Sequence, residues 1–156
     1  MHLTKQELDE FEEIIKKYKE HHAVQLMKQF MQHGSVSTYE HCEDVARHCF
    51  WLNRRLHLNA NEEDLVIAAL LHDFFLYDWH YNTPESQGHA TGHAEKARKN
   101  AVKYFNVNKK VQKIISGHMW PVNITKVPTD REAAILVIID KYCSLRETLF
   151  KRKKRK

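Results

Sequence analysis

Asp140 is the residue whose sequence surroundings most strongly indicate chemistry. It directly follows residues 133–139 (AAILVII), an apolar run with no polar side to turn toward water. A buried carboxylate without a partner is strongly destabilising or takes up a proton, so Asp140 needs a cation. That cation is either Lys141 or Arg146 of the same chain, or a metal ion.

The pair His72-Asp73 poses the same problem at the end of a second apolar run, residues 68–71 (AALL). One buried His or Asp is more often hydrogen-bonded to backbone than bound to metal. This chain, however, holds 12 histidines, where roughly three or four would be usual at average composition. Six histidines and aspartates adjoin apolar patches in five expected helices or helix ends, which favours one shared polar site. They are His41, His72, Asp73, His93, His118 and Asp140.

These ligand types indicate a site for one or two divalent transition-metal ions. Imidazoles together with carboxylates suit Fe, Mn, Co, Ni or Zn, and the lack of cysteine ligands argues against a structural zinc. A carboxylate at Asp73 is able to bridge two ions, and a pair about 3.5 to 4 Å apart holds a hydroxide in line with phosphorus. Lys141 and Arg146 are then placed to neutralise phosphate oxygens, although on a surface they would be only solvated cations.

Seven helices are expected to position these residues, because helical spacing of apolar side chains dominates the chain. They are expected over residues 4–19, 22–32, 37–56, 61–73, from 91 onward, 108–118 and 133–150. Three stretches have the form of a capping box, and three single residues are further expected caps. The boxes are Thr4-x-x-Glu7, Ser37-x-x-Glu40 and Thr129-x-x-Glu132, and the single caps are Asn61, Thr91 and Asn108.

Two residues beside the expected ligands have secondary roles in this interpretation. His89 is a weaker candidate for the role of His93. Asp44, three residues after His41, either orients that histidine as a hydrogen-bond acceptor or only favours the helix N-terminus.

Aromatic residues flank the expected ligands on two sides. Phe74 and Phe75 are expected to be core and loop-anchoring residues. Trp79, His80 and Trp120 are instead candidates for a wall on which a nucleobase stacks.

The composition is typical of one all-α domain that is soluble and cytoplasmic. The chain has 156 residues with only 4 Gly and 3 Pro, and alternation of strand type is nearly absent. No apolar stretch approaches about 18 residues, so no membrane partner is expected, and the polar, acidic N-terminus is unlike a signal peptide. The three cysteines form no CxxC pair and are expected to be reduced core residues.

The excess of positive over negative charge in this chain comes from residues 151–156. The formal net charge is +5, and this KRKKRK segment carries +6, which leaves −1 for residues 1–150. We therefore expect one domain over 1–150 and a basic, disordered tail over 151–156, with nucleic acid not expected as a partner.

The order of the candidate ligands resembles the H…HD…D signature of the HD-domain metal-dependent phosphohydrolases over about residues 35–147. The signature positions here are His41, His72, Asp73 and Asp140. His93 and His118 look like the two extra histidines of the dinuclear branches of that superfamily. The resemblance implies a single-domain, all-α bundle of about seven helices.

One stretch is also partly similar to the diadenosine-tetraphosphate hydrolase branch, whose D-K-x-x-x-x-R ending is matched by Asp140-Lys141 and Arg146. Residues 119–121 (MWP) stand where that branch has a glycine-containing turn. Residues 74–77 (FFLY) replace a lysine that usually follows the HD pair. These departures affect the expected substrate more than the expected metal.

The resemblance implies hydrolysis of a phosphoester or phosphoanhydride by a metal-held hydroxide, with a nucleotide or related small phosphorylated metabolite as substrate. His72, Asp73, Lys141 and Arg146 would carry the reaction. The alternative is a non-catalytic binding or interaction module that contacts RNA through residues 151–156. A complete ligand set argues against this alternative, because a module without chemistry does not need six buried polar residues around one site.

Overall fold

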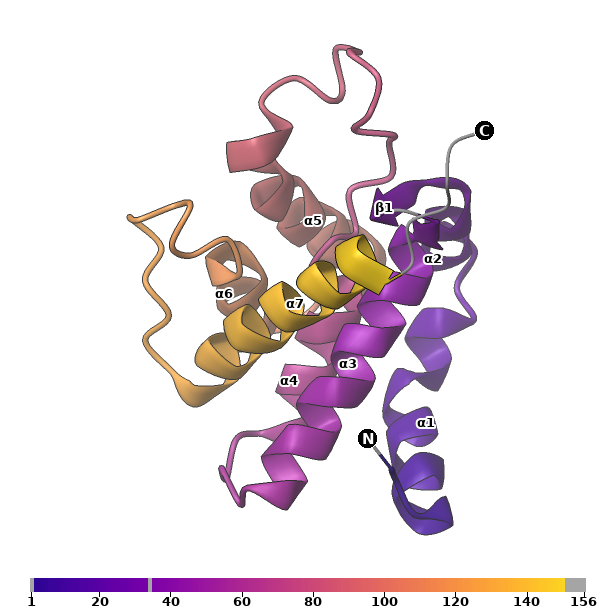
Figure 1. Cartoon of the computed structure of the whole chain (residues 1–156), viewed down its shortest axis with the longest axis vertical. Helices are drawn as coiled ribbons and strands as arrows, with labels where there is room; N and C mark the ends of the chain where they lie inside the picture. The colour runs from indigo at the N-terminus through magenta and orange to yellow at the C-terminus, as the bar shows by residue number, and fades with distance from the viewer. Residues whose placement is uncertain (1, 34, 151–156) are drawn as a thin grey trace.

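The computed structural model describes residues 2–33 and 35–150, and helices dominate the secondary structure of these residues (Figure 1). A 3-10 helix, η1 (Leu26–Gln29), and a two-stranded antiparallel sheet, β1 (Met31–His33) with β2 (Val36–Ser37), lie between α2 and α3. The α-helices are α1 (Lys5–Lys19), α2 (His22–Gln25), α3 (Thr38–Arg55), α4 (Glu62–Leu71), α5 (His89–Phe105), α6 (Lys109–Gly117) and α7 (Arg131–Phe150). The predicted all-α class is confirmed.

Helix α4 lies at the centre of the bundle and determines where the polar site forms. All of its residues from Leu65 to Leu71 are buried, and it packs against α1, α3, α5, α6 and α7. In Figure 1, α7 crosses in front of α3 and α4. Burying a Leu, Ile or Val side chain contributes about 1.5 to 3 kcal/mol, so this helix is strongly held in the interior. His72 and Asp73, which follow its last turn, are therefore buried with it.

Local capping interactions explain where most helices begin. The Thr4 and Ser37 capping boxes are both formed, and Asn61 and Asn108 accept from the backbone N–H groups of Asp64 and Val111. These side chains satisfy N–H groups that have no partner within the helix.

The predicted capping box at Thr129 is wrong, because Asp130 caps α7. The Asp130 carboxylate accepts from the backbone N–H of Ala133 at 3.0 Å. The Glu132 side chain does not reach back to Thr129. It accepts instead from the backbone N–H of Asn61 at 2.5 Å and from Lys110 at 2.9 Å, and so ties α7 to the starts of α4 and α6.

Replacing Asp130 by alanine is expected to lower the free energy of unfolding by about 1 kcal/mol, because it removes the cap of α7. Thr129→Ala is the matched control and is expected to change it by less than about 0.5 kcal/mol. Urea unfolding followed by circular dichroism measures both. An equal loss in the two variants would show that the helix start is held in another way.

The predicted helix over 22–32 is correct only as far as Gln29, through α2 and η1, and is wrong beyond it, because the chain turns there into the β1–β2 hairpin. Phe30 has an extended backbone, with φ −106° and ψ 132°. Its carbonyl accepts from the backbone N–H of Thr38 at 2.8 Å and also from the Thr38 hydroxyl. Hydrogen bonds across this hairpin therefore replace the helical hydrogen bonds that local spacing predicted. This hairpin places the Gln32 side chain in the interior.

Helix α5 begins at His89, two residues before the predicted cap at Thr91. Gly88 is the N-cap, with φ +68°, a left-handed conformation that glycine adopts without a steric penalty. The carbonyl of Gly88 accepts from the backbone N–H of Gly92 at 2.8 Å, which closes the first turn. His89 and His93 are therefore one turn apart on the same helix.

The remaining expectations have different outcomes. Cys42, Cys49 and Cys143 are buried free thiols, as expected. Across the described part of the chain, none of the helices combines the length and the apolar character needed to cross a membrane. The predicted disordered tail, residues 151–156, lies outside the described residues.

Candidate metal centre

The structure brings the six predicted ligands together in the interior. They come from five elements: the start of α3, the end of α4, α5, the end of α6 and α7. None of the six is more than 7% exposed. They are His41, His72, Asp73, His93, His118 and Asp140.

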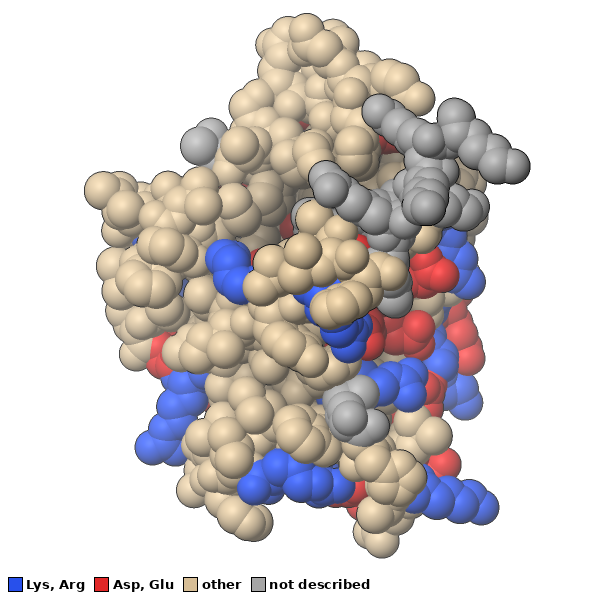
Figure 2. All heavy atoms as spheres, viewed as in Figure 1, with Lys and Arg blue, Asp and Glu red and all other residues tan. Residues whose placement is uncertain are grey.

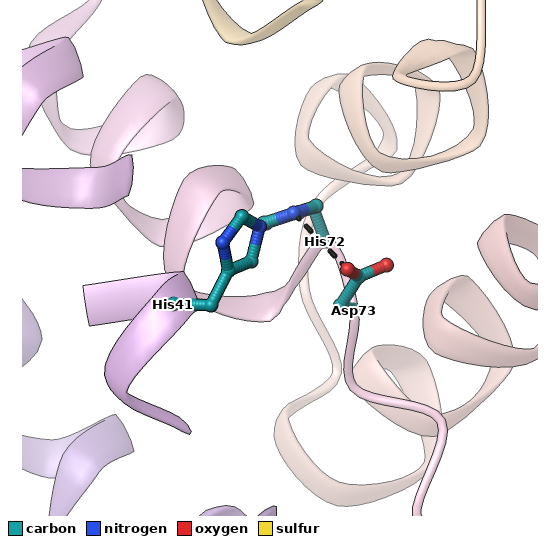
Figure 3. Close-up of side chains that lie close together, drawn as sticks. All are labelled: His41, His72 and Asp73. Carbon is teal, nitrogen blue, oxygen red and sulfur yellow. Dashed lines mark ion pairs between the residues drawn. The ribbon is translucent and has the colours of Figure 1, made fainter. Parts of the chain in front are cut away.

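The first group of donor atoms lies between α3, α4 and α7. Nε2 of His41 lies 3.2 Å from Oδ1 of Asp140, and Nε2 of His72 lies 3.6 Å from the same oxygen. Nε2 of His72 also lies 3.4 Å from Oδ2 of Asp73, the ion pair that is dashed in Figure 3. The figure shows the His41 and His72 side chains turned toward each other, with the Asp73 carboxylate beside His72. His41, His72 and Asp73 offer donor atoms that all lie within 4.8 Å of one another.

The second group shares Asp73 with the first. Nε2 of His93 and Nε2 of His118 lie 3.2 and 3.5 Å from Oδ1 of Asp73. The two Nε2 atoms are 3.0 Å apart. Because the two oxygens of one carboxylate face two different groups of histidines, Asp73 is placed as a bridging ligand.

Three of the histidines have their tautomer determined by backbone contacts. Nδ1 of His72, of His93 and of His118 each meets a carbonyl oxygen and must donate to it. The acceptors are Ala69, His89 and Ile115, at 2.7, 2.8 and 2.7 Å, respectively. In the neutral ring, Nε2 then carries a bare lone pair that faces the site. Two such lone pairs at the His93–His118 distance repel each other unless a proton or a metal ion lies between them. The contact between Nδ1 and a backbone carbonyl is typical of metal-ligating histidines.

His41 is held by a residue that the sequence analysis missed, Glu147. Nδ1 of His41 lies 2.9 Å from Oε2 of Glu147, whose side chain is fully buried. Of the two roles considered for Asp44, the orientation of His41 is wrong, because Asp44 forms an ion pair with Arg146 instead. Glu147 lies two helical turns after Asp140, so it is on the same face of α7. That spacing was the signal by which it could have been found.

Contacts between Asp140 and the histidines of the site favour the charged form of both partners. Burial alone would raise the pKa of Asp140, but contacts with His41 and His72 hold it well below its usual range. Burial alone would lower the pKa of His41, yet the hydrogen bonds to Asp140 and Glu147 raise it to about 10. A metal ion at this site would therefore replace bound protons, and its affinity should rise as the pH rises.

Among the described residues, two buried atoms of the predicted ligands are without a hydrogen-bond partner, and both fit a role as metal ligands. They are Nε2 of His72 and Oδ1 of Asp73. Folded proteins rarely leave buried polar atoms unsatisfied, so these atoms call for a partner outside the chain. Imidazole nitrogens and carboxylate oxygens are donors that divalent transition metals accept, so the residues present fit such an ion.

Gln32 is a second residue of the site that the sequence analysis missed. Its side-chain amide donates to Oδ2 of Asp73 at 2.5 Å, and its carbonyl oxygen accepts from the Thr38 hydroxyl at 3.3 Å. Gln32 was hidden by the incorrect helix over 22–32, since its side chain reaches Asp73 only because β1 is extended.

The two predicted cations differ in where the structure places them. Nζ of Lys141 lies 3.0 Å from Oδ2 of Asp140 and donates to the carbonyl of His118 at 3.1 Å, so it contacts the ligand set. The guanidinium of Arg146 pairs with Asp44, and it donates to Nε2 of His48 at 3.3 Å. A phosphate role for Arg146 therefore stays a prediction.

His89 lies outside both donor groups and packs against His93. The two rings stack with centroids 4.5 Å apart, and Nδ1 of His89 lies 2.9 Å from the Tyr77 hydroxyl. Burial, together with the nearby His93, lowers the pKa of His89 to about 4. His89 therefore favours the neutral form, and its ring packs against the His93 ring and helps to hold it in place.

The aromatic residues beside the site differ in their environments. Phe74 and Phe75 are buried, as core residues are. Trp79 stacks on His80 and on His89, with ring centroids 4.0 and 5.1 Å apart, and Trp120 is 37% exposed. Nucleobase stacking on these residues stays a prediction.

Comparison with known proteins gives one match. A family model described as HD domain matches residues 38–145. No curated protein and no solved structure matches the chain. The matched region covers more than half of the sequence. It contains the five residues of the two donor groups and, in addition, Asp140.

Proposed function

We propose that this chain, which belongs to the HD domain family, hydrolyses a phosphoester or phosphoanhydride of a nucleotide or related small metabolite. Members of the HD domain family are generally metal-dependent hydrolases, and the His/Asp clusters of this chain could hold a metal. The observation that carries the proposal is the shared carboxylate. Asp73 belongs both to the group with His41 and His72 and to the group with His93 and His118.

The proposed cofactor is one or two divalent ions of Fe, Mn, Co, Ni or Zn. His41, His72, Asp73 and Asp140 would hold one ion, and Asp73, His93 and His118 the other. Bound at this site, the ions would polarise a phosphate group and activate a water molecule for attack on phosphorus. A single ion would leave His93 and His118 as residues that contact the substrate.

The residues around the ligands have positioning roles in this proposal. Glu147 and the backbone carbonyls keep the imidazoles in the orientation that presents Nε2 to the site. Gln32 holds one oxygen of Asp73, so the rotation of that carboxylate is restricted. Lys141 contacts Asp140, while its side chain is 41% exposed. It therefore lies between the ligands and solvent, where it can neutralise an arriving phosphate.

A substrate series tests the proposed class. We expect the metal-loaded protein to turn over mononucleotides or dinucleoside polyphosphates at least about tenfold faster than sugar phosphates. The reason is that metals, Lys141 and flanking aromatics offer separate contacts to phosphates and base. Release of inorganic phosphate and separation of nucleotide products measure the rates, with chelator-treated protein as the control.

Three results would contradict the proposal at different points. Equal rates throughout, or a preference for sugar phosphates, would show that no base is recognised. Turnover that survives removal of the metal would exclude metal-dependent hydrolysis. Absence of turnover on every substrate, together with RNA binding that requires residues 151–156, would favour the non-catalytic module.

A further inference from the structure

The solvent-facing side of α7 carries an apolar stripe that the candidate metal centre does not use. Ile138, Tyr142, Leu145 and Leu149 recur at helical spacing and are 62, 52, 61 and 62% exposed. Phe150, at the end of the helix, is 80% exposed. We call these five residues the α7 stripe. Isolated exposed apolar residues are ordinary, but a contiguous row of large ones marks an interaction surface.

The α7 stripe continues into shallow grooves on the same side of the molecule. Four of its residues, together with Arg146, line a groove of about 370 Å³. Trp51 and Leu52 of α3 line a second groove of about 550 Å³ beside Ile138 and Tyr142. Figure 2, viewed from the side on which α7 lies in front, shows this ridge as mainly uncharged surface with a few Lys and Arg side chains beside it.

A concentrated positive charge follows the stripe directly in the sequence. Residues 151–156, which come immediately after Phe150, read KRKKRK and carry +6, whereas residues 1–150 carry −1. The exposed apolar side chains and the cationic segment are thus consecutive in the chain.

In place of the expectation of no membrane partner, which considered only apolar stretches long enough to span a bilayer, we propose that the C-terminal end of α7 docks this protein onto an anionic lipid bilayer. Leu145, Leu149 and Phe150 enter the boundary between headgroups and acyl chains, and residues 151–156 pair with anionic headgroups. A second copy of the chain would cover the apolar stripe but gains nothing from six consecutive cations. RNA would neutralise those cations but gains nothing from aliphatic side chains. An anionic lipid surface accommodates both features at once.

In this proposal α7 lies on the bilayer surface and does not cross the bilayer. The opposite side of α7 holds Ile139, Asp140 and Cys143, which are buried in the core and in the candidate metal centre. Because one side of the helix is committed to the protein, only the exposed side is available to lipid. The site and the bilayer therefore engage opposite faces of α7.

Vesicle binding by the full chain tests the proposal. We expect the protein to float with vesicles of phosphatidylcholine containing about 30% phosphatidylserine and to stay unbound with phosphatidylcholine alone. Changing all six residues of 151–156 to Gln should weaken binding at least about a hundredfold. The double variant Leu149→Ser with Phe150→Ser should weaken it about tenfold or more.

The matched control is Val122→Ser with Ile124→Ser, which alters two residues that are 61 and 75% exposed in the loop before α7 and should leave vesicle binding unchanged. All variants should keep phosphate release from a small substrate, so vesicle binding is scored independently of the proposed hydrolysis. Absence of binding to the anionic vesicles would overturn the proposal, and so would binding that the serine pair does not affect. A solution dimer that the serine pair dissociates, without vesicle binding, would assign the stripe to a second copy and overturn it as well.

Discussion

Asp73→Ala is expected to lower phosphate release about a thousandfold, while the helical circular dichroism spectrum stays that of the unaltered protein. Asp73 is the one carboxylate common to both donor groups, so its loss removes a ligand from each proposed ion. The fold should persist, because Asp73 lies after, not within, the apolar run of α4, and the packing of that run against five other helices holds the bundle together.

Asp64→Ala is the matched control, since Asp64 lies at the opposite end of α4 and bonds the side chain of Asn108 on the surface. It should change phosphate release by less than about twofold. Full activity of Asp73→Ala would refute the assignment of this ligand. Loss of helical content in metal-free Asp73→Ala or in the metal-free unaltered protein would point to a structural ion instead.

Glu147→Ala is expected to weaken metal binding about 10- to 100-fold, the usual effect of removing the carboxylate that orients a ligating histidine. The substitution removes the carboxylate that contacts Nδ1 of His41 in a fully buried position. Glu147→Gln keeps an acceptor oxygen and should lose less. Competition with a chromogenic chelator measures the affinity, and activity at saturating metal should recover largely in both variants.

Asp44→Asn tests whether Asp44, the other carboxylate near His41, orients that histidine in place of Glu147. Asp44 contacts Arg146 and His48, so its substitution should change metal affinity by less than about threefold. A larger loss for Asp44→Asn than for Glu147→Ala would show that the orientation of His41 depends on Asp44. Activity of Glu147→Ala that stays low at saturating metal would show that Glu147 does more than position the ring.

The elements that could be predicted from sequence are those that depend on neighbouring residues. Asn61 and Asn108 cap helices through bonds to N–H groups three residues away, so their function is visible in a short stretch. His72 and Asp140 were identified because each follows an apolar run, and an apolar run buried in the core carries the next residue inward. The core position of α4 thus made part of the site predictable.

The features that could not be predicted depend on contacts between distant segments. Gln32 reaches Asp73 across 41 residues of chain, through a hairpin whose strands pair only in the folded protein. Glu147 meets His41 across 106 residues. Glu132 bonds to Asn61 and Lys110 instead of completing a local capping box. For Gln32 and Glu132, a tertiary partner outcompeted the local interaction that the sequence pattern indicated.

Metal content is the most direct test of the central claim that this site binds divalent ions. Protein purified without chelator, then stripped and reconstituted with Fe, Mn, Co, Ni or Zn, should contain about one to two equivalents of transition metal by elemental analysis. The His72→Ala, Asp73→Ala double variant should retain less than about a tenth of an equivalent. If the unaltered protein itself holds less than about a tenth of an equivalent both before and after reconstitution, the site does not bind metal and the proposed function fails with it.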